Sequence, residues 1–172
     1  MYVTARCSQG QTHILAKQEK SHSCGMACVG MVIGRMRGQL LDEKSLRQYS
    51  GVFEQGKYNP RPTTGYTAGW GTEMENLAIM LRKVCIPAKV NQVHDVSSPF
   101  KSAHVTHPVL AHVVWDGGGG HFVVVDGVSR GGRVVVCDPI PRYGLREVEH
   151  LPAYNPDGKS QGRFSGYIIT TT

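Results

Sequence analysis

The sequence predicts an α+β fold, in which N-terminal helices pack on a C-terminal antiparallel β-sheet. Two observations carry the α+β prediction. Residues 24–37 form an almost continuous apolar segment of helical length, and valine-rich runs separated by glycine turns follow residue 108. Helices first and strands second, rather than an alternation of the two, are typical of α+β proteins.

The length and composition fit a soluble globular chain. We expect residues 1–172 to form a single domain, with a helical part over about 14–85 and a sheet part over about 86–172. No apolar run is long enough for a membrane span, and the first residues contain no signal-peptide core. The net charge of +6 comes from scattered basic residues, so nucleic acid is not expected as a partner.

Five cysteines argue against a disulfide-stabilised protein. Their number is odd and their spacing irregular: Cys7, Cys24, Cys28, Cys85 and Cys137. No Cys or His pair completes a zinc-finger pattern with Cys24 and Cys28, so neither a metal site nor a cofactor is expected. The pattern favours a reducing compartment, where one Cys with a distant His and Asp is a candidate nucleophile.

The first predicted helix covers residues 24–37, and its apolar positions recur at helical spacing. Ser23 is the expected N-cap, which places Cys24 in the first turn. Gly38 suits the C-terminal end of the helix.

Two further helices are expected in the first half. The shorter one covers about residues 42–49, and the other follows Thr72 and ends near residue 84. Thr72 with Glu75 three residues on has the arrangement of a capping box. Between these helices, residues 50–70 are rich in Gly, Pro, Asn and Tyr, and are predicted to form a long loop that borders the substrate cleft.

The second half contains five predicted strands. Their β-branched composition and the glycine turns between them favour antiparallel pairing. The strands are expected at residues 88–93, 108–115, 121–127, 133–139 and near 166–170.

Cys24 and His121 have the chemistry and the local setting of a nucleophile and its base. The N-terminus of a helix favours the thiolate, the form of Cys24 that attacks a carbonyl. His121 begins a strand after four glycines, and an imidazole exchanges protons near neutral pH.

Asp138 and Gln18 complete the candidate site. Asp138 ends the strand that follows the His121 strand, and an antiparallel hairpin brings the end of one strand beside the start of the other. The Asp138 carboxylate can therefore orient the imidazole of His121. Gln18 precedes Cys24 by six residues, and its amide could donate to an oxyanion together with the Cys24 backbone N–H.

This order of residues resembles the papain-like superfamily and, in detail, the C39 peptidases, which process bacteriocin leaders and are often fused to export transporters. The resemblance rests on residues 18–28, 71–81, 108–112, 121–125 and 134–139. It implies that Cys24 is the nucleophile, His121 the base, Asp138 the orienting residue and Gln18 part of the oxyanion hole. Ser23 stands where that family commonly has Asp.

The resemblance implies a cysteine endopeptidase with a protein or peptide substrate, and it raises cleavage at a Gly-Gly site as a hypothesis. Trp70, Gly119 and Gly120 are assigned to substrate binding. The chain also resembles toxin domains that bacterial secretion systems deliver into a target-cell cytoplasm and that a cognate immunity protein inhibits. Two alternatives remain open: a deamidase or amidase on the same fold, and a catalytically inert binding module.

Overall fold

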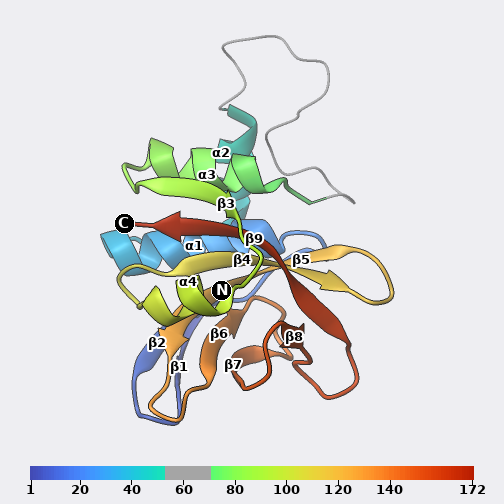
Figure 1. Cartoon of the computed structure of the whole chain (residues 1–172). Coiled ribbons are helices and arrows are strands. Elements are labelled where there is room, and N and C mark those ends of the chain that lie inside the picture. The colour runs from blue at the N-terminus through green and yellow to red at the C-terminus, as the bar shows by residue number, and fades with distance from the viewer. Residues whose placement is uncertain (53–70) are drawn as a thin grey trace.

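A computed structural model describes residues 1–52 and 71–172, with residues 48–52 described by their helical backbone alone. The fold is α+β, as the sequence predicts. A seven-stranded antiparallel sheet has the order β3 (Ala88–Gln92), β9 (Gly162–Thr171), β4 (Val109–Trp115), β5 (Gly120–Val128), β6 (Val134–Asp138) and β7 (Gly144–Val148), with β8 (Ala153–Tyr154) paired to β9. A separate hairpin joins β1 (Tyr2–Arg6) to β2 (Thr12–Ala16) (Figure 1). No helix in the described ranges is both long enough and apolar enough to cross a membrane.

Helix α1 (Cys24–Arg37) agrees with the predicted first helix and lies at the centre of the fold. Every residue from Gly25 to Gly34 is buried, as expected for a helix that is apolar on all sides. Gly38 adopts the left-handed conformation (φ 69°) and ends the helix, as predicted. Ser23 occupies the N-cap position but makes no capping hydrogen bond, because its hydroxyl bonds instead to the backbone N–H and carbonyl of Lys20.

Helices α2 (Glu43–Val52) and α3 (Met74–Lys83) also form where the sequence predicts helices. The predicted capping box at Thr72 is wrong, because α3 begins two residues later and its N-cap is Glu73, with no side-chain capping bond. The buried residues of α3 include Leu77 and Leu81, which belong to the same hydrophobic core as the buried residues of α1.

The five predicted strands all form, with small differences at their ends. They are β3 (Ala88–Gln92), β4 (Val109–Trp115), β5 (Gly120–Val128), β6 (Val134–Asp138) and β9 (Gly162–Thr171). Although β9 is last in sequence, it lies between β3 and β4 and pairs antiparallel with both. The last strand of the chain is therefore an interior strand of the sheet.

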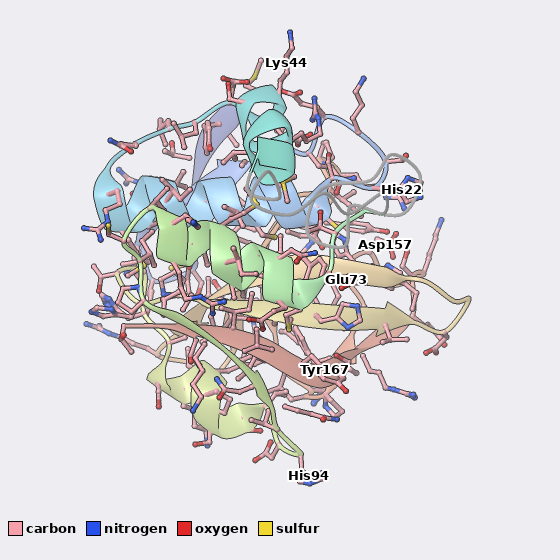
Figure 2. All side chains as sticks on the ribbon, turned by 90° about the horizontal axis from the view of Figure 1, so that it is seen from above. His22, Lys44, Glu73, His94, Asp157 and Tyr167 are labelled. Carbon is pink, nitrogen blue, oxygen red and sulfur yellow. The ribbon has the colours of Figure 1, made fainter. Side chains whose placement is uncertain are left out.

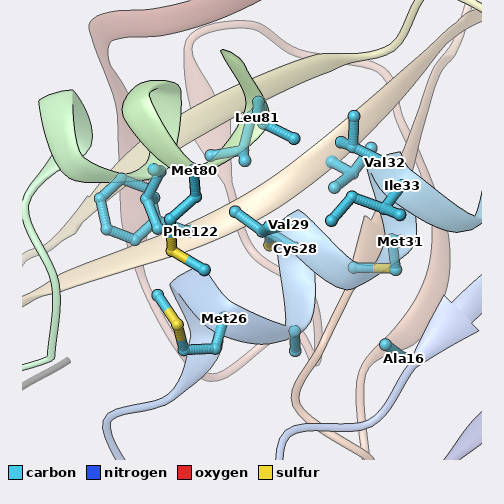
Figure 3. Packing of buried hydrophobic residues seen from close by; sticks show 14 of the residues in the cluster. Ala16, Met26, Cys28, Val29, Met31, Val32, Ile33, Met80, Leu81 and Phe122 are labelled. Atoms are coloured by element: carbon cyan, nitrogen blue, oxygen red, sulfur yellow. The ribbon is translucent and has the colours of Figure 1, made fainter. Parts of the chain in front are cut away.

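Both faces of the sheet are covered by a hydrophobic core, and neighbouring residues of a strand point to opposite faces. Leu110 and Val124 join the core beneath α1 and α3, while their neighbours Ala111 and Val123 join a second core that contains Phe100. Figure 3 shows the first of these cores, with side chains of α1 packed between α3 and β5. Each fully buried aliphatic side chain of this kind stabilises the fold by about 1.5–3 kcal/mol.

Several elements were not predicted from the sequence. They are the N-terminal hairpin of β1 (Tyr2–Arg6) and β2 (Thr12–Ala16), the short helix α4 (Ser97–Ser102), and strands β7 (Gly144–Val148) and β8 (Ala153–Tyr154). Strand β2 therefore precedes α1 at the beginning of the part that was expected to be helical, about residues 14–85. These elements are short, and most of their residues are only partly buried, so their apolar patterns are weak.

Candidate active site

Cys24 is the first residue of α1 and lines a cleft that this helix end shares with the start of α3 and with residues of strands β4, β5 and β9. Its side chain is half-buried. The next residue must be small, because a Cβ on Gly25 would lie 3.0 Å from Leu77 Cδ2 on α3. The first backbone N–H groups of a helix have no partner within it, so α1 presents donors beside the Cys24 thiol.

His121 and Asp138 lie side by side at one end of the sheet. Because Val124 of β5 is opposite Cys137 of β6, the start of β5 comes next to the end of β6, as the hairpin argument predicts. His121 Nε2 lies 3.0 Å from Asp138 Oδ1, and both side chains are almost fully buried. The second ring nitrogen of His121 stays available on the side of the cleft that His121 shares with Cys24.

The environment of His121 favours the imidazolium form. Burial alone would lower its pKa, but the hydrogen bonds and charges of Asp138 and Cys24 outweigh burial and raise the pKa to about 9. The His121 imidazole is therefore protonated at neutral pH and offers a positive charge to the neighbouring nucleophile in the cleft.

Two aromatic residues that the sequence analysis did not select support this pair. The Trp115 ring stacks on His121 with centroids 5.6 Å apart and an interplanar angle of 26°. The Tyr154 hydroxyl donates a hydrogen bond of 2.6 Å to Asp138 Oδ2. Burial and the Asp138 charge raise the pKa of Tyr154 well above its ordinary value, so the phenol stays protonated and keeps donating.

Asp138 is fully engaged by these partners. Its Oδ1 accepts from the Ile140 backbone N–H at 2.7 Å in addition to contacting His121, and Oδ2 accepts from Tyr154. The carboxylate therefore has a fixed orientation, and it fixes the plane of the imidazole in turn. Sequence patterns do not single out Tyr154, because it lies in a strand of only two residues.

Gln18 is close to the site in the chain, but its side chain does not line the cleft. Its amide donates to the carbonyls of Lys20 (2.8 Å) and Ser21 (3.2 Å), and its backbone N–H donates to Pro139 next to Asp138. In this conformation both amide hydrogens hold the loop that leads to Cys24, and neither points at an oxyanion.

The cleft has a volume of about 450 Å³. His22, Glu73 and Tyr167, which line it together with Cys24 and His121, lie along one side of the molecule (Figure 2). Of the residues assigned to substrate binding, Gly120 lines the cleft and Gly119 does not. Trp70, like most of the predicted loop over residues 50–70, lies outside the described residues.

His112 was not selected from the sequence, yet it forms part of the cleft wall. Its Nδ1 lies 2.9 Å from Ser165 Oγ, and its ring packs against the ring of Phe122, with centroids 5.1 Å apart. Burial, followed by the charge of nearby His121, lowers the pKa of His112, so this second histidine is neutral where His121 is charged. The two imidazoles can therefore have different tasks.

A family model described as "Peptidase C39 family" matches residues 64–151, slightly more than half of the chain. The chain belongs to the peptidase C39 family. These residues include His121 and Asp138 but begin after Cys24, which lines the same cleft as His121. Family membership makes the protein a cysteine peptidase, and the search of curated proteins gave no match for this C39 peptidase.

Solved structures similar to this C39 peptidase include peptidase domains of ComA. The domain from Streptococcus ComA, a bifunctional ABC transporter of a quorum-sensing pathway, has a TM-score of 0.65 at 18% identity, covering 92% of this chain and 96% of that one. The Streptococcus mutans ComA domain gives 0.54 at 18% identity, covering 92% and 98%. In complex with a small-molecule inhibitor the corresponding values are 0.55, 16%, 92% and 98%. At these identities the likeness confirms the predicted papain-like fold.

Proposed function

We propose that this C39 peptidase is a cysteine endopeptidase in which Cys24, His121 and Asp138 are the catalytic residues. The observation that carries the proposal is that Cys24 of α1 and the hydrogen-bonded His121–Asp138 pair of the sheet open onto one cleft. Nucleophile, base and orienting group have the mutual arrangement that acyl transfer requires.

In the acylation half of the reaction, the Cys24 thiolate attacks the carbonyl carbon of the scissile peptide bond. Negative charge then develops on the carbonyl oxygen beside the N-terminus of α1, where the Cys24 backbone N–H donates to it. Gln18 supplies a second donor once one of its amide hydrogens leaves the loop carbonyls. Protonated His121 gives its proton to the leaving amine, and an acyl-enzyme on Cys24 remains.

In the second half, neutral His121 takes a proton from a water molecule, which attacks the acyl-enzyme and restores the Cys24 thiol. Asp138 keeps the imidazole in one tautomer throughout, because its hydrogen bond to Nε2 leaves the other nitrogen for the reacting groups. The stacked Trp115 ring covers the imidazole and restricts its rotation.

A peptide with a Gly-Gly cleavage site is the substrate that family membership favours. ComA, whose peptidase domain shares the fold, is described as a transporter that also carries this domain. We propose cleavage after Gly-Gly on this basis. Three further points stay predictions from the sequence: delivery by a bacterial secretion system, inhibition by an immunity protein and residence in a reducing compartment. That residues 1–172 form a single domain is also a prediction.

The decisive experiment on the nucleophile uses a thiol-directed affinity probe, with the modified cysteine mapped by mass spectrometry. Fast labelling of Cys24 that is lost in His121→Ala supports the activated pair. If Cys24 is labelled slowly and equally in both proteins, the thiol is not activated and the chain is better described as a binding module.

A second measurement separates the peptidase from a deamidase or amidase. Peptides that contain Gly-Gly are incubated with the protein, and their products are analysed by mass spectrometry. New termini at the glycine pair support the proposal, while a mass change without backbone cleavage identifies the alternative chemistry. Cys24→Ala should reduce turnover by roughly 10⁴-fold or more and leave the fold intact, so retained turnover would contradict the assignment of Cys24.

A further inference from the structure

The cleft contains a second imidazole that the proposed reaction does not use. His112 of β4 lies opposite Phe122 of β5, and it lines the cleft together with Cys24 and His121. Its side chain is half-buried. A polar ring in such a position either satisfies both of its nitrogens within the protein or offers one of them to a ligand. The hydrogen bonds of His112 show that the second case applies.

The hydroxyl group of Ser165 decides which nitrogen of His112 carries the proton. Ser165 Oγ lies 2.9 Å from His112 Nδ1, donates to the His112 carbonyl at 3.3 Å and accepts from the Tyr167 backbone N–H at 3.3 Å. A hydroxyl has one hydrogen and two acceptor positions. The carbonyl can only accept and the backbone N–H can only donate, so Nδ1 takes the remaining acceptor position as a donor. A neutral imidazole has a single N–H, and Nε2 therefore keeps its lone pair.

The position of Ser165 is part of the sheet itself. The pairing of β4 with β9 changes register between Ala111 and Val113, and Ser165 lies on the β9 side of this irregularity. The next residue, Gly166, has a left-handed conformation (φ 87°), and a Cβ there would overlap the Val93 carbonyl oxygen. Irregularities of this kind re-aim side chains next to functional sites. Here the irregularity directs the Ser165 hydroxyl at His112.

The other nitrogen of His112 is left open. Within the described part of the chain Nε2 has no hydrogen-bond partner, and it is not one of the buried unpartnered atoms. A Cβ on Gly120 would overlap Nε2, so a glycine is required to leave room for this edge of the ring. Gly120 also lines the cleft and directly precedes His121. The open acceptor therefore lies beside the backbone that carries the proposed base.

An uncharged acceptor complements the groups around the nucleophile. The start of α1 presents backbone donors beside Cys24, and the protonated ring of His121 can only donate. A bound peptide brings N–H groups as well as carbonyl oxygens into the cleft, and each N–H that leaves water needs an acceptor. Burial, followed by the charge of His121, lowers the pKa of His112 and so keeps Nε2 free to accept.

We propose that His112 is a specificity-determining residue whose Nε2 accepts a hydrogen bond from a backbone N–H of the peptide substrate beside the scissile bond. The inference rests on the proposed peptidase function, because its ligand is the peptide bound at Cys24. Ser165 is a positioning residue that holds the imidazole in the accepting tautomer. A substrate with proline or an N-methylated residue at the contacted position has no N–H to offer and should be cleaved poorly.

The first measurement needs no substrate. With isotope-labelled histidine, nitrogen chemical shifts in NMR spectra distinguish protonated from unprotonated ring nitrogens, and His112→Asn identifies the signals of His112. We expect a protonated Nδ1 and an unprotonated Nε2 in the parent protein near neutral pH, and a mixture of tautomers in Ser165→Ala. The opposite tautomer in the parent protein would overturn the proposal. An unchanged tautomer in folded Ser165→Ala would overturn the role of Ser165.

The second measurement uses peptides that contain Gly-Gly, in which an ester oxygen replaces one backbone N–H at a time on either side of the scissile amide. We expect one of these replacements to lower kcat/KM about tenfold in the parent protein. His112→Asn keeps a donor for Ser165 but lacks the acceptor, so it should lose the same factor on the all-amide peptide and show no further loss on the ester. His112→Gln, whose amide oxygen can take the place of Nε2, should recover most of the activity.

His107→Asn is the matched control, because His107 is exposed and does not line the cleft. Folding of each variant is checked by circular dichroism. An ester effect of the same size in His112→Asn, or equal activities of His112→Asn and His112→Gln, would overturn the proposal. A parent protein that does not cleave the all-amide peptide contradicts the proposed function and with it the peptide contact. Cleavage without any ester-sensitive position contradicts the role of His112 alone.

Discussion

The Asp138 carboxylate shows how much of the site depends on single buried contacts. Sequence spacing was enough to place Cys24, His121 and Asp138 together, because a helix start and one hairpin bring them close through local geometry. Tyr154 and Trp115 could not be found in this way. Each reaches the site from a different part of the sheet, and only the three-dimensional arrangement gives their aromatic rings a role.

Replacement of Tyr154 by Phe removes one hydrogen bond from Asp138 and keeps the aromatic ring. We expect kcat to fall about tenfold with little change in KM, because a hydrogen bond to a charged group contributes about 1.5–3 kcal/mol to its orientation and charge. Steady-state kinetics on a cleavable peptide would measure this. Tyr143→Phe is a suitable control, since Tyr143 bonds to Ser160 rather than to Asp138. Equal effects of the two substitutions would contradict a positioning role for Tyr154.

The raised pKa of His121 predicts the alkaline limit of activity. The imidazolium protonates the leaving amine, so kcat/KM should fall above about pH 9, where His121 loses its proton. The stability contributed by this proton is complete below the ordinary pKa of 6.5 and is lost as the pH rises through about 9. A pH–rate profile checks the prediction, and Asp138→Asn should shift the limit to lower pH. An alkaline limit that Asp138→Asn leaves unmoved would argue that another group controls it.

At the scale of elements, helices and buried strands were predicted with greater success than exposed short ones. Helix α1 and strands β4, β5 and β6 contain long apolar runs that fit one secondary structure. The N-terminal hairpin has short strands, and its position is decided by tertiary contacts such as the Tyr2 hydroxyl, which donates to the Leu41 carbonyl at 2.6 Å. Gln18 illustrates the same limit, because the loop that takes up its amide is not apparent from spacing.

The turn between β4 and β5 allows a matched pair of substitutions. A Cβ on Gly120 would lie 2.4 Å from His112 Nε2, so Gly120→Ala must displace this ring from the cleft wall. Gly117→Ala is the control, since a Cβ there meets nothing within 4 Å. We expect KM to rise several-fold, roughly the effect of losing about 1 kcal/mol of binding, for Gly120→Ala alone. Equal KM values for the two variants would indicate that His112 does not contact the substrate.

At the scale of the whole molecule, Arg35 joins α1, the N-terminal hairpin and the sheet. Its Nη2 donates to the Ile14 carbonyl at 2.7 Å and to Asp126 at 2.8 Å, and its side chain is 3% exposed. Arg35→Met would leave a buried carboxylate with less compensation and should lower the free energy of unfolding by about 3–5 kcal/mol. Urea denaturation measures the loss.

Arg133→Met supplies the comparison for Arg35→Met. Arg133 pairs with Glu149 at the surface, where both side chains are about half exposed, so its replacement should cost only about 0–1 kcal/mol. Similar losses for the two variants would show that the buried charges of Arg35 and Asp126 contribute no more than a surface pair.

The place of β9 in the sheet affects how the protein is made. Strands β3 and β4 leave the ribosome before β9, yet in the sheet each of them pairs with β9 and not with the other. Until Gly162–Thr171 has been synthesised, the growing chain carries unpaired strand edges that are prone to associate with other chains. Chaperones that bind the growing chain should therefore increase the yield of soluble peptidase. Lowering the temperature only after synthesis should have a smaller effect, because β9 is then already present.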